Sequence, residues 1–397
     1  MIVLYQEKKN CCGCTACMNV CKKKAITMKK DTEGFNYPVV NESVCLDCGM
    51  CKGICDFQNT ITPVPDFNEP LVYAVKHKKD SVRMTSSSGG AFTAISDYIL
   101  KKQGVVYGVS FDDDMTVVHK RALTTVDRDR FKGSKYVQSD LSDIFQLVEL
   151  DLINGLLVLF TGTPCQCAGL KRYLDTKRIF QDKLVLCDIV CHGTSSPKIW
   201  HEHINSLAKR ENSTVKAYDF RSKIYGWRNH TEKVVYENGK NDYKSMLSQM
   251  HKKIYNSRNA HRPACHHCIY TSFLRYSDIT IADFWNIEKT IPDFYDDKGA
   301  SLVLVNTIKG VEVFNQIKEM ILYLLSSAND CVQPQLIKPT EASNDRDRFW
   351  NDYYSKGYNY IIKEYFNYGF FRQIKVKIKK TAKDVLLKVD TQKKLKN

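Results

Sequence analysis

Short apolar runs alternate with helix-like stretches along the middle of the chain. Runs of strand length occupy 71–75, 105–111, 116–122, 156–160, 184–190 and 301–306. Helical spacing of apolar residues follows at 91–102, where Gly104 would end the helix, and again at 311–325. Because strand, turn and helix recur in this order, the pattern predicts an α/β core with parallel strands.

The amino-acid composition changes at several points along the chain, and these changes predict how the chain divides into parts. Residues 1–58 are rich in cysteine, and residues 59–70 carry three of the ten prolines and predict a linker. Residues 71–150 and 151–335 have the composition of a globular domain, and we take them as the two parts of one core. Residues 336–397 are aromatic and then strongly basic, and they predict a tail.

The composition is that of a folded protein, except for its cysteines. The chain has 397 residues, 43% hydrophobic and 26% charged, which at about 150 residues per domain predicts two or three domains. Nine of its sixteen cysteines lie in the first 55 positions. The opening residues are too short for a signal peptide, and the apolar stretch 152–160 is too short to span a membrane. We therefore expect a cytoplasmic protein, whose clustered cysteines bind metal or carry out redox chemistry.

Eight of the N-terminal cysteines form two copies of one spacing. Cys11, Cys14, Cys17 and Cys21 follow C-x2-C-x2-C-x3-C, and Cys45, Cys48, Cys51 and Cys55 repeat it. This run is typical of bacterial ferredoxin domains with two 4Fe-4S clusters, in which each fourth cysteine binds the other cluster. We therefore assign one cluster to Cys11, Cys14, Cys17 and Cys55, and the other to Cys45, Cys48, Cys51 and Cys21.

The spacing departs from the ferredoxin pattern in one respect. A proline normally follows the fourth cysteine, and Lys22 and Asp56 stand there instead. The predicted ligands remain complete, so the departure concerns the turn and not the clusters. A zinc module, which prefers paired C-x2-C knuckles, and a disulfide framework are the alternatives. Cys12 is left over, and we expect it to be an ordinary side chain.

Three short motifs in the core suit an anion or a flat ring. Ser86-Ser87-Ser88-Gly89-Gly90 precedes a predicted helix, where free N–H groups favour phosphate and glycines allow close approach; a plain serine cap is the alternative. Lys132-Gly133-Ser134-Lys135-Tyr136 supplies cations and an aromatic ring, or is a solvated loop. Thr161-Gly162-Thr163-Pro164 follows a buried strand, where ligands bind in open α/β sheets.

Four further cysteines predict a second kind of metal site. Cys165 and Cys191 follow buried strands, and Cys265 and Cys268 form a C-x2-C pair. Together they would make a four-thiolate site. A zinc site of Cys187, Cys191, Cys265 and Cys268, or one that uses a histidine, fits the spacing almost as well.

These motifs occur in one order, and that order resembles a known family. SSSGGAFTAI, KGSKYVQS, VLFTGTPCQCAGLK, DIVCHGTSSPKIW, the C-x2-C pair followed by SDITIADFWNI, and KGASLVLVNT come after the paired cysteine runs. The combination, over residues 1–335, is similar to the beta subunits of coenzyme F-420 (deazaflavin) hydrogenases and dehydrogenases. The family also includes reductases such as 7-hydroxymethyl chlorophyll a reductase. ADFWNI stands where the family has a GDFWG-like run, which puts close ligand approach there in doubt but keeps Asp283 and Trp285.

The resemblance implies an iron–sulfur flavoprotein that carries FAD. The predicted class is then α/β, with an α+β ferredoxin-like N-terminal domain followed by an α/β flavin-binding core. The three motifs and Asp283 would lie against the flavin, and Cys165, Cys191, Cys265 and Cys268 would hold a third 4Fe-4S cluster. His192 would donate a proton during turnover, or would only hold the end of its strand.

The implied activity is that of an oxidoreductase. Clusters pass single electrons and a flavin exchanges one or two, so the chain would connect ferredoxin or another one-electron carrier to a small organic substrate. Two other functions stay open. The chain could be an electron-relay subunit of a larger redox complex without its own substrate. It could also be a binding protein stabilised by zinc and clusters, which would hold no flavin.

The C-terminal residues carry much of the net charge of +15. Residues 372–397 contain ten lysines and arginines and two aspartates. With the aromatic residues before them, they predict a basic amphipathic helix at the inner face of a membrane, a docking site for an acidic ferredoxin, or a solvated tail. Nothing else in the sequence resembles a nucleic-acid fold, so we expect no nucleic-acid partner.

Overall fold

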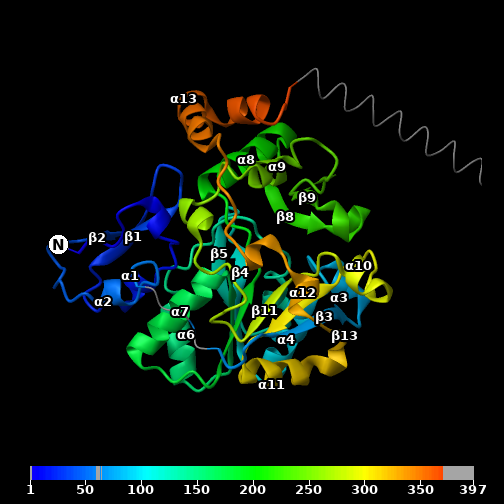
Figure 1. Cartoon of the computed structure of the whole chain (residues 1–397). Helices are drawn as coiled ribbons and strands as arrows, with labels where there is room; N and C mark the ends of the chain where they lie inside the picture. The colour runs from blue at the N-terminus through cyan, green and yellow to red at the C-terminus, as the bar shows by residue number, and fades with distance from the viewer. Residues whose placement is uncertain (1, 60–62, 64, 370–397) are drawn as a thin grey trace, which may run out of the picture.

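The structure, a computed structural model, describes residues 2–59, 63 and 65–369 (Figure 1). They form a small N-terminal domain, a large mixed sheet with helices on both faces, and a second unit of strands and helices. The fold is α/β, as the alternating pattern predicts. The basic segment 372–397 lies outside the described residues, and so does the amphipathic helix predicted there.

In the N-terminal domain, the backbone conformation repeats together with the cysteine spacing. Its elements are α1 (Ala16–Val20), β1 (Ile26–Lys30), β2 (Asn36–Val40) and α2 (Met50–Gly53), with β1 and β2 paired as an antiparallel hairpin. Left-handed backbone occurs at equivalent positions of the two cysteine runs, at Gly13 and Asp47 and again at Thr15 and Gly49. Because most residues avoid this conformation, the match indicates that the two cysteine loops follow the same course.

An eight-stranded mixed sheet forms the centre of the core. In spatial order its strands are β13 (Ile321–Ser326), β3 (Leu71–His77), β12 (Ser301–Val305), β11 (Ile279–Asp283), β7 (Leu184–Ile189), β6 (Val158–Gly162), β4 (Val105–Phe111) and β5 (Val117–Ala122). The four strands β11, β7, β6 and β4 run parallel, and the other neighbours pair antiparallel. The prediction of parallel strands is therefore wrong for 301–306. The connection 284–300 contains only α10 and one 3-10 turn, with no helix long enough to cross a face of the sheet, and β12 returns antiparallel beside β11.

Helices cover both faces of this sheet. One hydrophobic layer lies under α4 (Ala91–Lys101) and α11 (Ile308–Ile317), and the other under α6 (Ile144–Ile153) and α7 (Pro164–Lys177). Helix α1 adds apolar side chains to the α6–α7 layer, so the N-terminal domain packs on that face. The shorter helices are α3 (Asp80–Met84), α5 (Thr125–Asp129), α10 (Ile287–Thr290) and α12 (Ala328–Cys331). Short 3-10 turns occupy Lys8–Asn10, Lys223–Tyr225, Trp227–Asn229, Pro263–His267, Pro292–Phe294, Lys318–Met320 and Pro334–Leu336.

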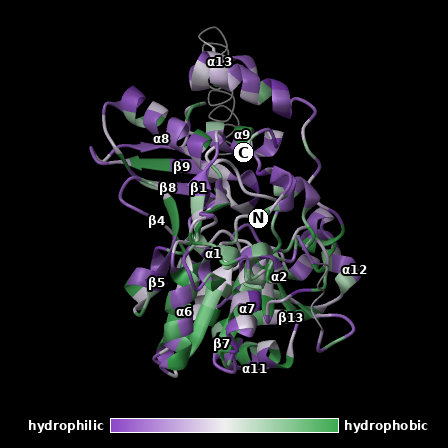
Figure 2. Cartoon of the chain, turned by 90° about the vertical axis from the view of Figure 1, so that its left-hand side faces the viewer, coloured by the Kyte–Doolittle hydropathy of each residue, from purple (hydrophilic) through white to green (hydrophobic). Residues whose placement is uncertain are grey.

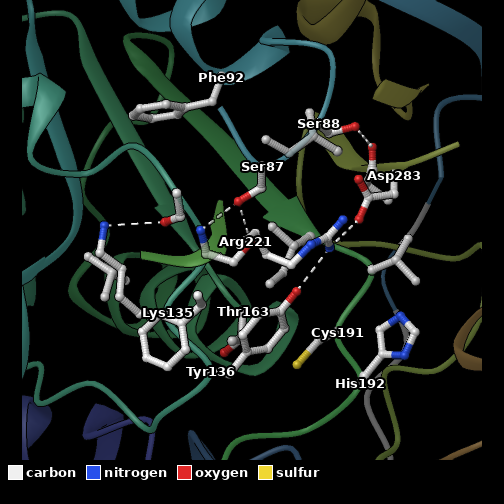
Figure 3. A pocket seen from close by; sticks show the side chains of 18 of the residues that line it. Ser87, Ser88, Phe92, Lys135, Tyr136, Thr163, Cys191, His192, Arg221 and Asp283 are labelled. Atoms are coloured by element: carbon white, nitrogen blue, oxygen red, sulfur yellow. Dashed lines mark hydrogen bonds and ion pairs between the residues drawn. The ribbon is translucent and has the colours of Figure 1, made fainter. Parts of the chain in front are cut away.

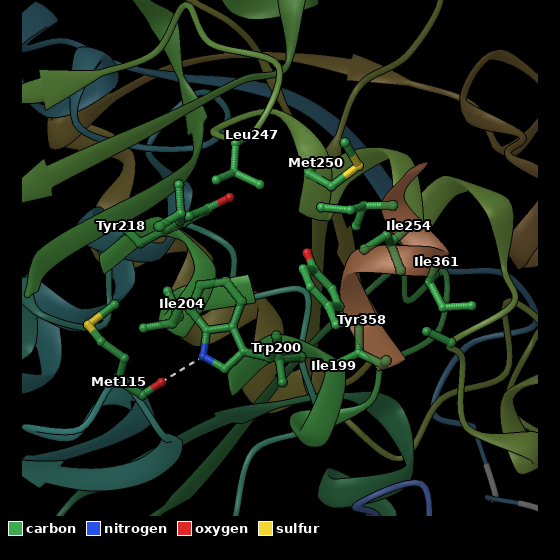
Figure 4. Packing of buried hydrophobic residues seen from close by; sticks show 14 of the residues in the cluster. Met115, Ile199, Trp200, Ile204, Tyr218, Leu247, Met250, Ile254, Tyr358 and Ile361 are labelled. Atoms are coloured by element: carbon green, nitrogen blue, oxygen red, sulfur yellow. Dashed lines mark hydrogen bonds between the residues drawn. The ribbon is translucent and has the colours of Figure 1, made fainter. Parts of the chain in front are cut away.

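A smaller antiparallel sheet and three helices form a second hydrophobic unit. Its elements are β8 (Val215–Ser222), β9 (Thr231–Tyr236), β10 (Asn241–Asp242), α8 (Pro197–Glu211), α9 (Met250–Ser257) and α13 (Arg346–Glu364). Trp200 lies in its centre and donates from Nε1 to the carbonyl of Met115 at 2.7 Å (Figure 4). Phe349, Trp350 and Tyr358 of α13 are buried here. The aromatic part of the predicted tail is thus part of a core.

Two predicted element boundaries are wrong. Helix α11 ends at Ile317, and 321–326 form the edge strand β13 instead of continuing a helix to residue 325. A short apolar run does not distinguish helix from strand, and pairing with β3 decides for the strand. The left-handed residue after α4 is Gln103 and not Gly104. Gly104 is required for another reason, because a Cβ there would lie 2.4 Å from the carbonyl oxygen of Leu157.

Hydropathy follows this layering. Figure 2 shows hydrophobic residues along the central strands and many hydrophilic residues on α8 and α13. In the described part of the chain, no helix is both long and apolar enough to cross a membrane.

Candidate functional site

A cavity of ≈ 350 Å³ opens where three parallel strands end. Its wall includes the carboxyl ends of β6, β7 and β11 and the N-terminus of α4. In parallel sheets these ends share one edge, which is where ligands bind. Most of the predicted cofactor residues line this cavity: Ser86, Ser87, Ser88, Gly90, Lys132, Ser134, Lys135, Tyr136, Thr161, Gly162, Thr163, His192 and Asp283.

The serine–glycine turn connects two walls of the cavity (Figure 3). Ser87 Oγ accepts hydrogen bonds from the amide (2.8 Å) and the hydroxyl (3.0 Å) of Ser134, which joins the turn to the lysine-rich loop. The hydroxyls of Ser86 and Ser88 donate to the carbonyls of Val82 and Ala300, both at 2.7 Å. These hydroxyls hold the turn in place, while the first N–H groups of α4 remain without intrahelical partners.

Gly89 and Pro164, two of the predicted cofactor residues, are not among the residues that line the cavity. A Cβ on Gly89 would lie 2.3 Å from the carbonyl oxygen of Val75 and 2.5 Å from the amide of Ser301, so this glycine lets the turn pack on the sheet. Pro164 is the first residue of α7, a position that favours proline. Gly89 and Pro164 thus support the segments that line the cavity without lining it themselves.

The lysine-rich loop holds its cations close to the backbone. Lys135 donates from Nζ to the carbonyls of Arg130, Lys132 and Gly133 at 2.9 to 3.2 Å. Burial lowers the pKa of Lys135 to about 7. An anion in the cavity would therefore stabilise the ammonium form.

Arg221 is the principal cavity residue that the sequence does not predict. Its guanidinium donates from Nη1 to Asp283 Oδ2 at 2.8 Å and to the Tyr136 hydroxyl at 3.2 Å. Asp283 is held from its other side by Trp227, whose Nε1 donates to Oδ1 at 2.8 Å. Among the described residues, the buried Nε and Nη2 atoms of Arg221 have no hydrogen-bond partner. Asp283 thus orients a guanidinium that retains free donors at the cavity.

An aromatic stack closes the wall beside this ion pair. Trp285 and Trp227 are stacked with ring centroids 5.3 Å apart, and the guanidinium of Arg228 lies 5.0 Å from the Trp285 ring. Asn286 has left-handed backbone, with φ 69°. Asparagine tolerates this conformation, so it can replace the second glycine of the family's GDFWG-like run. Ala282 lines the cavity at the position of the first glycine.

His192 lines the cavity next to Cys191 (Figure 3). Burial lowers the pKa of this imidazole, and the nearby Asp283 carboxylate opposes the shift. Its backbone carbonyl accepts a hydrogen bond from the Thr340 hydroxyl at 2.9 Å. The strand end is therefore fixed by the backbone, and the role of the ring as a proton donor stays a prediction.

Four cysteines gather between the cavity and the N-terminal domain. Burial, with the neighbouring thiols of Cys265, Cys165 and Cys268, raises the pKa of Cys191 well above its usual range. The amide of Gly193 donates to Cys191 Sγ at 3.4 Å, and a Cβ on Gly193 would lie 3.4 Å from that of Cys265. The four cysteines first predicted are thus neighbours, and their role as ligands of one site stays a prediction. Cys187, from the alternative set, lies instead in the hydrophobic layer under α4 and α11.

The N-terminal cysteines group with their fourth members exchanged. Burial, then Cys14, Cys11, Cys55 and Cys51, raises the pKa of Cys17 well above its usual range. Burial, then Cys48 and Cys21, raises the pKa of Cys51, and Cys51 packs with Cys45. These neighbours include members of both predicted ligand sets, and the assignment of ligands to two clusters stays a prediction. Across residues 2–59, 63 and 65–369, no three cysteine, histidine or carboxylate side chains converge closely enough to hold a single metal ion.

Cys12 is not the ordinary side chain expected from the sequence. The neighbouring thiols of Cys14 and Cys165, which belong to different domains, raise the pKa of Cys12 well above its usual range, and burial adds to this shift. Gly169 of α7 makes room for this contact, since a Cβ there would lie 2.9 Å from Cys14 Sγ. Arg262 strengthens the same interface by donating from Nε to the carbonyl of Cys11 at 2.8 Å.

The comparisons with known proteins agree with the predicted family over part of the chain. Residues 156–330 match the family described as the C terminus of the beta subunit in coenzyme F420 hydrogenase/dehydrogenase. A solved structure of the F420-reducing [NiFe] hydrogenase complex from Methanosarcina barkeri contains a similar chain, at 19% identity and a TM-score of 0.45. The match covers 66% of this chain and 85% of that one. No curated protein matches the chain in sequence. Residues 156–330, somewhat less than half of the chain, are therefore similar to the C terminus of the coenzyme F420 hydrogenase/dehydrogenase beta subunit.

Proposed function

We propose that this protein is an iron–sulfur flavoprotein oxidoreductase, which connects a one-electron carrier to a small organic substrate. The observation that carries the proposal is the order in which the cysteine thiols of the protein follow one another in space. The N-terminal groups lead through Cys14 and Cys12 to Cys165, and the core group ends at Cys191 in the cavity wall. A continuous arrangement of this kind suits electron transfer between the protein surface and the cavity.

The residues present fit the proposed cofactors. Two ferredoxin-type sets and the core set each offer four cysteines to a 4Fe-4S cluster. The cavity, at ≈ 350 Å³, falls within the range of ligand pockets, roughly 300–1,000 Å³. Its wall combines apolar residues such as Phe92 and Phe131 with Lys135 and the free donors of Arg221. Such a wall matches FAD, which has a flat ring system and anionic phosphates.

The bound groups would supply the redox chemistry, with clusters carrying single electrons and a flavin exchanging one or two. The chain's own residues would bind and orient. The serine–glycine turn and α4 would present N–H groups to an anion, and Arg221 would donate while Asp283 holds its orientation. Trp285 and Phe92 would exclude water from the cavity wall.

Electron entry is proposed at the second N-terminal cysteine group. Cys48 is exposed, and Lys22, Lys23, Lys24 and Lys52 are exposed next to Cys21 and Cys51. These lysines would attract an acidic carrier such as a ferredoxin.

A relay subunit without its own substrate is the second candidate, and one observation favours it. The edge strand β13 exposes Leu322, Tyr323, Leu324 and Leu325, and 321–327 contain no charged residue. Natural edge strands usually carry charges that prevent pairing with another chain. A larger redox complex would cover this edge.

Anaerobic reduction by reduced ferredoxin tests the proposal. We expect ferredoxin to bleach the flavin absorbance of the purified protein, and Cys14→Ser to slow this reduction while a small chemical reductant still bleaches the flavin. Cys331→Ser is the matched control, because Cys331 is buried in a different hydrophobic cluster. Equal rates in all three proteins, or purification without flavin, would contradict the proposal.

A further inference from the structure

A chain of buried polar groups leads away from the cavity, and the functions assigned so far leave it unused. Glu232 and His251 line the cavity and are 1% and 0% exposed. Behind them Tyr218, His203 and Tyr358 continue into the second hydrophobic unit, among side chains such as those in Figure 4. Burying a carboxylate and two imidazoles is costly, so their presence points to a role beyond packing.

Ser195 determines which nitrogen of His251 carries hydrogen. The Ser195 hydroxyl donates its single proton to the carbonyl of Tyr136 at 2.7 Å, and the same oxygen lies 3.1 Å from His251 Nε2. Because the hydroxyl proton is already used, Nε2 carries a hydrogen and donates it to Ser195. In a neutral His251, the Nδ1 atom then presents a lone pair.

That lone pair faces a carboxylate. His251 Nδ1 lies 3.6 Å from Glu232 Oε1, and the amide of Lys252 donates to Glu232 Oε2 at 2.9 Å. Two acceptors facing each other in a buried site repel. A proton held by one of them removes the conflict. One proton between Glu232 and His251 would therefore relieve the repulsion at the wall of the cavity.

The remaining groups can pass a proton toward this pair. Burial and the neighbouring Glu232 carboxylate raise the pKa of Tyr218 well above its usual range, and the Tyr218 hydroxyl also lies 3.4 Å from the carbonyl oxygen of Ser248. His203 Nε2 lies 3.2 Å from the Tyr218 hydroxyl, and His203 Nδ1 lies 3.1 Å from the Tyr358 hydroxyl. When Tyr358 donates to Nδ1, Nε2–H donates to Tyr218, and Tyr218 donates to Glu232. One arrangement of hydrogens thus directs every donor toward the cavity.

The outer end of the chain lies at a break in α13. Tyr358 follows Gly357, whose backbone (φ 78°, ψ 178°) interrupts the helix. Among the described residues, no atom lies within 4 Å of the position that a Cβ on Gly357 would take. Tyr358, next to this break, is 4% exposed.

We propose that Glu232, supplied through Tyr218, His203 and Tyr358, delivers protons to the group that is reduced in the cavity. The inference rests on the proposed function, because electrons that arrive through clusters bring no protons. Glu232 releases its proton to a basic atom formed by the arriving electrons and takes the hydroxyl proton of Tyr218. Tyr218 takes the Nε2 proton of His203, and His203 takes the proton of Tyr358 at Nδ1. Solvent water restores the proton of Tyr358, so only O–H and N–H bonds change.

Proton uptake during anaerobic reduction is the decisive measurement. A pH-indicator dye would follow uptake while flavin absorbance follows reduction, in wild type, Tyr358→Phe and Tyr218→Phe. We expect uptake to slow by about tenfold or more in both variants, as for removal of a general acid. Tyr353→Phe is the control, since Tyr353 is also buried on α13 but donates to Glu202, outside the chain.

A second readout does not require a loaded cavity. In the cofactor-free protein, infrared spectroscopy at neutral pH should detect a protonated carboxyl or imidazolium signal that is absent from both Glu232→Gln and His251→Gln. Uptake in Tyr358→Phe and Tyr218→Phe as fast as in Tyr353→Phe would overturn the inference, and so would the absence of this signal from wild type. Loss of flavin from wild type would contradict the proposed function instead, so the two failures are distinguishable.

Discussion

Replacing Asp283 by asparagine tests the ion pair that organises the cavity. The Asp283 side chain is 13% exposed and that of Arg221 is 3% exposed. Asparagine keeps an acceptor for Trp227, but it removes the negative charge that compensates the guanidinium. Breaking one side of a buried pair costs about 3–5 kcal/mol, because the remaining charge stays desolvated. At about 2 °C per kcal/mol for a unit of this size, Tm should fall by about 6–10 °C.

The assay is thermal unfolding of the cofactor-free protein, followed by circular dichroism. Asp112→Asn is the matched control, because Asp112 pairs with Lys120 at 3.0 Å but is 54% exposed. Its loss should cost at most about 1 kcal/mol. A shift in Asp283→Asn no larger than that of the control would refute the reasoning. Added FAD should restore part of the lost stability, since its phosphates would then compensate Arg221.

Three further predictions concern Arg221, Gly89 and His119. Arg221→Lys should weaken flavin retention by about tenfold, because one ammonium cannot replace both donor directions; equal retention after gel filtration would contradict this. Gly89→Ala should cost about 3 kcal/mol in urea unfolding, because the new methyl group would lie 2.3 Å from the Val75 carbonyl oxygen; wild-type stability would contradict it. Burial lowers the pKa of His119 to about 4 from 6.5, so the unfolded chain takes up the extra proton first as pH falls. Stability should therefore drop by about 3 kcal/mol between pH 6.5 and 4, and His119→Gln should flatten this slope; an unchanged slope would contradict the assignment.

The sequence predicts the parts of the site whose signals are local. Strands that end in Thr161-Gly162-Thr163 or in Cys191-His192 are recognisable because a short apolar run stops at turn residues, and parallel packing brings those ends together. The two cysteine runs are recognisable because their spacing is itself the signal.

What the sequence does not predict depends on distant contacts. Arg221 follows an ordinary alternating strand, and only the fold places it against Asp283. Cys12 gains its neighbours when α7 packs on the N-terminal domain. Residues 321–326 favour helix and strand almost equally until β3 offers its edge. The pairing of Glu232 with His251 also depends on a distant contact, because Glu232 lies on β9 and His251 lies on α9.

The most direct test of the account is a cofactor analysis of one anaerobically purified sample. Iron, acid-labile sulfide, zinc and released flavin should be measured together per chain. Three 4Fe-4S clusters predict about twelve irons and about twelve sulfides, with about one FAD and no stoichiometric zinc. About eight irons with zinc and no flavin would contradict the account, because a ferredoxin domain joined to a zinc-binding module could not carry out the proposed reaction.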